Sequence, residues 1–124
     1  MKAVLTLLAM TAAAPAAAQP TFGNPSRFTE QGGEAIYRAV CAGCHMPDGH
    51  GATGAGTYPS LIADPRLAQP GYPVSTVLKG QKAMPPFADA LTNEQVAAVV
   101  TYIRTNFENA FTDPLTAEDI GARR

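Results

Sequence analysis

The stretch Cys41-Ala42-Gly43-Cys44-His45 decides how the rest of the chain is interpreted. It contains both cysteines of the 124-residue chain and one of its two histidines. In a helical turn, two intervening residues set the thiols far enough apart to reach both vinyl groups of one porphyrin, and the next residue can place an imidazole on the iron. The spacing therefore predicts a covalent haem c site that anchors the ring and ligates the metal.

Three other kinds of site also use two cysteines. A thioredoxin-type dithiol follows a strand in a βαβ unit, which the residues around Ala39 and Val40 do not suggest. A structural zinc site needs about four ligands, usually from two such pairs, and the sequence contains no second pair. An exported protein could form a disulfide between Cys41 and Cys44. Such a disulfide would close a strained two-residue loop and would leave His45 without a role.

The N-terminus has the three parts of a secretory signal. Lys2 precedes an apolar run that starts at Ala3, and three alanines ending at Ala18 form a small-residue cleavage region. We expect residues 1–18 to be a signal peptide and the protein to reach the periplasm, the side of the membrane where haem c is attached. The alternative is a retained membrane anchor, which the shortness of the segment and Pro15 disfavour.

Length and charge narrow the class of protein. A chain of 124 residues forms one domain, and without Lys2 it carries 8 basic and 10 acidic residues, a net charge of −2 with neutral histidines. There is no polybasic signature, so nucleic acid is not expected as a partner. About a hundred residues bury only a modest core, and an apolar macrocycle would add much of what the side chains lack.

Hydrophobic periodicity predicts a first helix just before the cysteine motif. It starts at Thr29 or Glu30 and ends between Val40 and Ala42. Gly33 lies in its interior, where a glycine costs roughly 1 kcal/mol relative to alanine. Close approach of another helix at Gly33 would account for it.

Three further helical segments follow. Val74, Val77 and Leu78 predict a short helix around residues 73–79, and a clearer one starts at a capping box of Thr92 and Gln95 and reaches Phe107 with one apolar face. Residues 115–120 have the staple-and-cap pattern of a last helix start. That last segment is marginal alone and should be either docked or mobile.

Two loops carry candidate iron ligands. Residues 47–56 are rich in glycine and predict a loop along the haem edge, in which His50 is favoured as a solvent-facing histidine over a second ligand, because it is five residues from His45. Met84 lies in a polar loop that two following prolines stiffen. This predicts Met84 as the sixth iron ligand, the alternative being a methionine that packs on the ring or the core.

Together these residues resemble the class I monohaem c-type cytochromes over roughly residues 30 to 107. The resemblance implies an all-α protein, a small cytochrome c fold of three to five helices wrapped around one covalently bound haem. We accordingly divide the chain after the signal peptide into an N-terminal arm (19–28), a cytochrome c domain (29–107) and a C-terminal extension (108–124) that is a candidate partner-docking tail.

The resemblance also implies site roles, carried over by position. Cys41 and Cys44 would be the thioether cysteines that bind haem c, with His45 as proximal and Met84 as distal axial ligand. The haem pocket would include two further residues. The carbonyl of Pro59 would accept the proton of the other imidazole nitrogen, and Leu61 would pack on the ring. Gly33 and Tyr37 match small and aromatic positions of the family, where its last helix crosses near Tyr102.

A narrower resemblance starts at Ala83 and runs through Phe107 to Arg123. It is to small cytochrome subunits that take electrons from periplasmic dehydrogenases. This implies an electron-transfer protein and not an enzyme, with a periplasmic dehydrogenase as donor, a downstream cytochrome or terminal oxidase of the respiratory chain as acceptor, and only indirect membrane contact. Lys79 and Lys82 form a small positive patch for steering such partners.

The alternative function is a five-coordinate haem c sensor of small ligands or a peroxidase-like enzyme. It requires Met84 to be off the iron. The sequence supplies no constellation of His, Arg and Glu for a reactive distal face, since His50 is the sole spare histidine.

Overall fold

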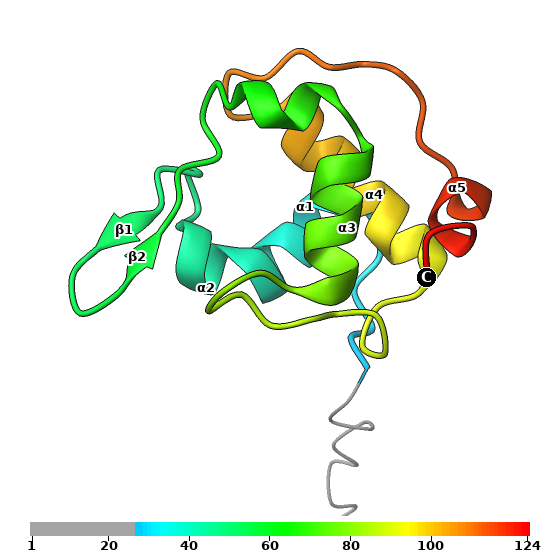
Figure 1. Ribbon diagram of the computed structural model, residues 1–124, viewed down its shortest axis with the longest axis horizontal. Coiled ribbons are helices and arrows are strands. Elements are labelled where there is room, and N and C mark those ends of the chain that lie inside the picture. Colours follow the sequence, from blue (N-terminus) through cyan, green and yellow to red (C-terminus); the bar gives the residue numbers. More distant parts are fainter. Residues whose placement is uncertain (1–26) are drawn as a thin grey trace, which may run out of the picture.

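A computed structural model describes residues 27–124, so the expected signal peptide and most of the arm lie outside the described part (Figure 1). The described chain is mostly helical, as predicted, with two short strands. In chain order its elements are α1 (Gly33–Ile36), the π-helical turn η1 (Tyr37–Cys41), α2 (Ala42–His45), β1 (Ala52–Thr53), β2 (Thr57–Tyr58), the 3₁₀ turn η2 (Pro65–Ala68), α3 (Gly71–Lys79), α4 (Asn93–Thr105) and α5 (Ala117–Gly121).

The first helix is formed by α1, η1 and α2, which follow one another without a break. Its predicted limits were wrong at both ends. It begins at Gly33 because Gly32 has a φ of 83°, outside the helical region, and it continues through His45 until Met46, with a φ of 64°. The cysteine motif therefore lies on the helix and not after it.

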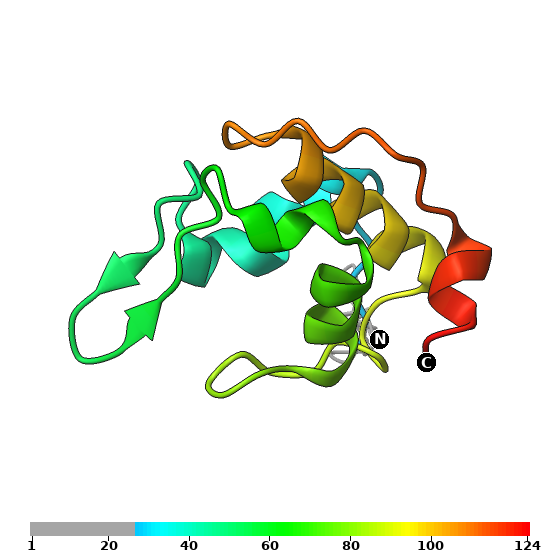
Figure 2. The ribbon, with the colours of Figure 1, turned by 45° about the horizontal axis from the view of Figure 1, so that its top comes forward.

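The crossing of the first helix with α4 confirms the expected role of Gly33. A Cβ atom at Gly33 would lie 2.3 Å from the carbonyl oxygen of Ala98 and 2.5 Å from Cβ of Tyr102. Only a residue without a side chain allows the two backbones to approach this closely. Figure 2 shows α4 lying across the start of the first helix.

The core lies between the first helix, α3 and α4. Its fully buried side chains come from all three helices and from α5: Ile36, Tyr37, Val74, Val96, Val99, Val100 and Ile120. Their spacing of three to four residues on α4 is the periodicity seen in the sequence. The core is contiguous, so these helices act as one support for the cysteine motif on the first helix and for the loop that carries Met84.

The predicted capping box of α4 is confirmed, but its predicted end was too late. The Thr92 hydroxyl accepts from the Gln95 backbone, and the Gln95 side chain accepts from the Thr92 backbone. The helix ends at Thr105, because Asn106 is extended and its side-chain amide donates to the carbonyl of Tyr102 at 2.9 Å. Gln95 also donates to the carbonyl of Phe28, which holds the end of the arm against α4.

The C-terminal extension is docked. Thr116 and Asp119 form the capping box that the sequence pattern predicted for α5, and Ile120 is completely buried against the core. Upstream, the buried Arg104 of α4 donates to Asp113 at 2.6 Å and to the carbonyl of Leu67 at 2.9 Å. The extension is thus part of the same packed unit (Figure 1).

The glycine-rich loop after α2 contains a hairpin that the sequence did not predict. β1 and β2 pair antiparallel, with Ala52 opposite Tyr58 and Thr53 opposite Thr57. The hairpin projects from the body of the molecule beside α2 (Figures 1 and 2). Within residues 27–124, no helix is long and apolar enough to cross a membrane.

Candidate functional site

The two cysteines lie one turn apart on the first helix. Cys41 ends η1 and is half-buried, whereas Cys44 lies in α2 and is exposed. Neither forms a disulfide, and burial raises the pKa of the Cys41 thiol to about 12, so without an attached group it stays protonated at neutral pH. Both sulfur atoms are free to form another bond.

The imidazole of His45 is oriented by a backbone carbonyl. Nδ1 of His45 lies 2.9 Å from the carbonyl oxygen of Pro59. Because a carbonyl can only accept, the proton sits on Nδ1, and Nε2 of the neutral ring keeps a lone pair for a metal. The structure thus forms the contact that the family resemblance implied for Pro59.

The turn after His45 is held by a residue whose role the sequence did not reveal. Tyr37 donates its hydroxyl proton to the carbonyl of Met46 at 2.7 Å, and burial, followed by the nearby Cys41, raises the pKa of Tyr37 far above its usual value. The Tyr37 ring also packs against Tyr102 and Phe107, at centroid distances of 5.6 and 4.8 Å. The family resemblance matched Tyr37 to an aromatic position near Tyr102, but nothing in the sequence indicated the contact to Met46.

Met84 lies on a short loop that its own backbone closes. The backbone N–H of Gln81 donates to the carbonyl of Met84, and the N–H of Met84 donates to that of Gln81, both at 3.0 Å. Gly80, with a φ of 71°, precedes this turn, and a Cβ there would lie 2.5 Å from the Met84 carbonyl oxygen. Met84 is half-buried against the core. Its role as distal ligand stays a prediction.

Leu61 is also half-buried against the core, at the end of the segment that carries Pro59. Asn109, which the sequence gave no reason to select, holds this segment. Its side chain donates to the carbonyls of Leu61 and Ile103 and accepts from the backbone of Asp64. The packing of Leu61 on a haem ring stays a prediction.

His50 lies on the solvent side of the loop. Its Nδ1 is 3.3 Å from a carboxylate oxygen of Asp48, and its side chain is 69% exposed. The backbone N–H of His50 donates to the Asp48 carboxylate, which is the main reason that the pKa of Asp48 lies below its usual value. The arrangement favours the solvent-facing interpretation over a second iron ligand.

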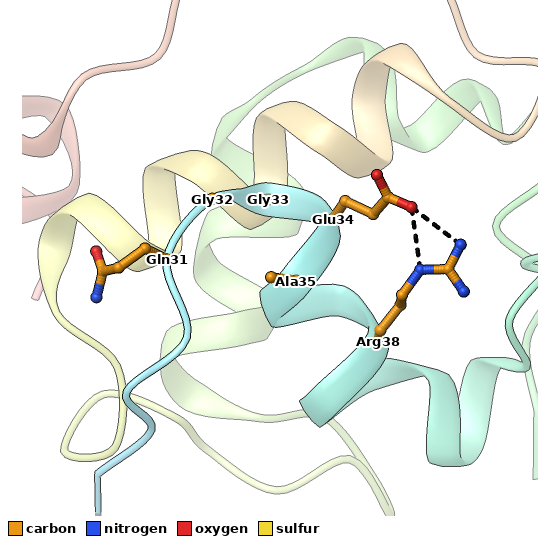
Figure 3. A pocket seen from close by; sticks show the side chains of 6 residues that line it. All are labelled: Gln31, Gly32, Gly33, Glu34, Ala35 and Arg38. Atoms are coloured by element: carbon orange, nitrogen blue, oxygen red, sulfur yellow. Dashed lines mark hydrogen bonds and ion pairs between the residues drawn. The ribbon is translucent and has the colours of Figure 1, made fainter.

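The pocket in Figure 3 is unrelated to the predicted ligands. It surrounds the start of α1, and an ion pair of Glu34 with Arg38 at 2.9 Å lies beside it. The predicted site is instead an open face. The hairpin and α2 lie on the side of the molecule away from α5, and the loop after α3 extends toward that side before it returns to the start of α4 (Figures 1 and 2).

The residues on this face fit a haem c. They provide two thiols without other partners, an imidazole whose Nε2 is free and a thioether sulfur. Several apolar side chains close in sequence to these residues pack against the core but are only half-buried: Val40, Ala42, Leu61 and Phe87. Such a group supplies one-electron oxidation and reduction at its iron.

The model of the family described as cytochrome c oxidase, cbb3-type, subunit III matches residues 29–103. The chain belongs to this family of c-type cytochromes. The match contains the cysteine motif, Pro59, Leu61 and Met84. The cytochrome is therefore a haem-binding electron-transfer protein, as predicted, and is not itself a catalytic enzyme.

The cytochrome is also similar to the fructose dehydrogenase cytochrome subunit of Gluconobacter japonicus. The two are 36% identical over an alignment of 93 residues, which covers 63% of this chain and 19% of that protein. The cytochrome thus matches less than a fifth of the length of this relative. The similarity agrees with the resemblance to dehydrogenase cytochrome subunits that the sequence suggested.

Proposed function

We propose that the cytochrome is a one-electron carrier with a single haem c, attached through Cys41 and Cys44 and ligated by His45 and Met84. The observation that carries this proposal is the hydrogen bond from His45 to Pro59. It fixes the protonated nitrogen on the side away from the metal and leaves Nε2 for the iron. The sequence has one such motif, which supports one haem.

The two axial residues set the redox properties. The thioether of Met84 is a neutral, weak donor that favours the ferrous state, whereas His45, donating its proton to Pro59, is a more basic ligand that favours the ferric state. Filling both axial positions leaves no site for oxygen or peroxide. The chain's own contribution would thus be to hold these two side chains in place.

We place the cytochrome in the periplasm, between a dehydrogenase as electron donor and a downstream cytochrome or terminal oxidase of the respiratory chain. Three features support this: the signal-like N-terminus, the need of haem c for an exported apoprotein, and the relative that is a dehydrogenase cytochrome subunit.

The donor would approach the face that carries the loop of Met84. Lys79 shortly precedes this loop and Lys82 lies within it; both are exposed, and within the described residues neither forms an ion pair. They provide a positive patch for a donor with acidic residues around its own redox centre. The docked extension, residues 108–124, offers only its outer surface to a partner because Ile120 belongs to the core.

The test is a spectrum of the protein made with haem c maturation in a periplasm. We expect covalent haem, a near-infrared band of the ferric iron–methionine bond, and no shift when carbon monoxide is added to the reduced protein. Ready binding of carbon monoxide or cyanide without that band would replace the carrier with the sensor or peroxidase-like function. A protein without covalent haem would overturn both.

A further inference from the structure

Both ends of the hairpin form hydrogen bonds with His45. At the start of the hairpin, the N–H of Gly51 donates to the carbonyl of His45 at 3.0 Å. At its end, the carbonyl of Pro59 accepts from the His45 imidazole at 2.9 Å. Because β1 and β2 pair between these points, the hairpin and the predicted iron ligand form one closed arrangement.

Gly51 is the point at which the two ends of the hairpin cross. Its φ is 69°, and a Cβ atom there would lie 2.2 Å from the carbonyl oxygen of Tyr58 and 2.8 Å from that of Pro59. These are backbone atoms, which cannot rotate away as the end of a side chain can. Any side chain at Gly51 must therefore displace the peptide that carries the Pro59 carbonyl.

Two other glycines of the hairpin can be compared with Gly51. Gly54 and Gly56 lie at its tip, and a Cβ atom at either would meet nothing within 4 Å. Neither has a positive φ that an alanine would find strained. The close contact is thus a property of Gly51 and not of glycines in this loop in general.

We propose that Gly51 is a positioning residue for His45. Its missing side chain lets the Pro59 carbonyl lie within hydrogen-bond distance of Nδ1, and this contact sets the orientation and basicity of the iron ligand. The inference rests on the haem c of the proposed function. A displaced carbonyl makes the imidazole a weaker donor, which destabilises the ferric state and raises the midpoint potential.

The experiment compares Gly51→Ala and Gly51→Asn with the control Gly54→Ala in holoprotein. Three quantities are measured: the midpoint potential, the exchange rate of the His45 Nδ1 proton by NMR in the reduced state, and the near-infrared methionine band. For both Gly51 variants we expect a roughly tenfold higher ratio of ferrous to ferric protein at a fixed ambient potential. The Nδ1 proton should exchange faster and the methionine band should persist. Gly54→Ala should behave as the wild type.

The asparagine variant separates two effects of a side chain at Gly51. Asparagine tolerates a positive φ better than alanine but has the same Cβ atom. Wild-type potential in Gly51→Asn would mean that only the backbone angle matters, which overturns the proposal. Unchanged proton exchange in both variants overturns it as well.

Haem uptake by the variants and the spectrum of the wild type test different proposals. If neither Gly51 variant takes up haem while Gly54→Ala does, Gly51 is needed for folding or maturation, and the narrower role in positioning His45 is overturned. The wild-type spectrum reports on the proposed function independently, since it does not involve any variant.

Discussion

The two predicted axial ligands are held in different ways. His45 lies on a helix and bonds through its side chain to the carbonyl of Pro59, fourteen residues away. Met84 lies on a loop, and the hydrogen bonds at its turn join only its backbone to that of Gln81. The comparison teaches that the histidine is oriented atom by atom, whereas the methionine is placed only as its loop is placed. When the protein is perturbed, ligation of the iron by Met84 should therefore be lost before ligation by His45.

The largest expected effect comes from removing the thioether. Met84→Leu keeps a side chain of similar volume on the core, so the fold should lose less than about 1.5 kcal/mol. We expect the near-infrared band to vanish and carbon monoxide to bind the reduced protein, with haem still attached through the first helix. Retention of the band would mean that another residue ligates the iron.

The loop can also be disturbed without touching Met84. In Gly80→Ala, the new Cβ would meet the Met84 carbonyl oxygen, and alanine is strained at a φ of 71°. We expect a loss of about 1 to 3 kcal/mol in the free energy of unfolding and a weaker methionine band. Gly56→Ala, at the open tip of the hairpin, is the matched control. Equal behaviour of the two variants in denaturant titrations would contradict this account of the loop.

The hairpin segment beside His45 and the loop of Met84 also differ in charge. This difference affects where an electron donor would approach. Residues 51–63 contain no charged side chain, whereas Lys79 shortly precedes the methionine loop and Lys82 lies within it. Changing both lysines to glutamate should slow reduction by the donor roughly tenfold at low ionic strength, with less effect in high salt. The control makes the same change in charge at Arg27 and Arg123, near the two ends of the described chain. Equal slowing in the control would leave the patch without a special role.

The smallest expected effect is a dependence on pH at the methionine side. The side chain of Arg66 donates to Asp64 and lowers the pKa of that carboxyl, and Arg66 also contacts Tyr72, which lies 3.5 Å from the side chain of Gln81. The stabilisation is complete above the unfolded pKa of about 3.9 and is lost as pH falls through the lower folded value.

Because Arg66 is 54% exposed, solvent screens the pair and the effect should be only about 0.2 to 1 kcal/mol. Asp64→Asn should flatten the acid dependence of the methionine band in this range. The exchange rate of the His45 Nδ1 proton serves as the internal reference, since its acceptor is a carbonyl that does not titrate. A band that fades with acid equally in Asp64→Asn and the wild type would rule out this pair as its cause.

The sequence predicted the features that depend on neighbours along the chain. The sequence predicted three such features, because each depends on only a few consecutive residues. They are the capping box of Thr92 and Gln95, the capping box before Ile120, and the helix that ends before Gly80. The close approach of another helix at Gly33 was predicted for a different reason. A glycine inside a helical pattern demands a packing partner, and α4 supplies it.

The features that were missed depend on contacts between distant segments or on weak local signals. Each strand of the hairpin has only two residues, which is too short to show an alternating pattern, so nothing in the sequence marked β1 and β2. The contacts of Tyr37 with Met46 and of Gly51 with the Tyr58–Pro59 peptide become visible only when the chain has folded back. The ligation of iron by His45 and Met84 stays a prediction because it involves a group outside the polypeptide.

The crossing of Gly33 with Ala98 also sets the order of events during biosynthesis. The two segments are separated by most of the domain, so this contact cannot form until α4 has been synthesised. A chain emerging N-terminus first therefore presents its thiols on a segment that has not yet closed. Loop closure over such a distance is slow compared with the growth of a local helix. Until this contact forms, Cys41 stays accessible to the haem attachment that we propose, before packing half-buries it.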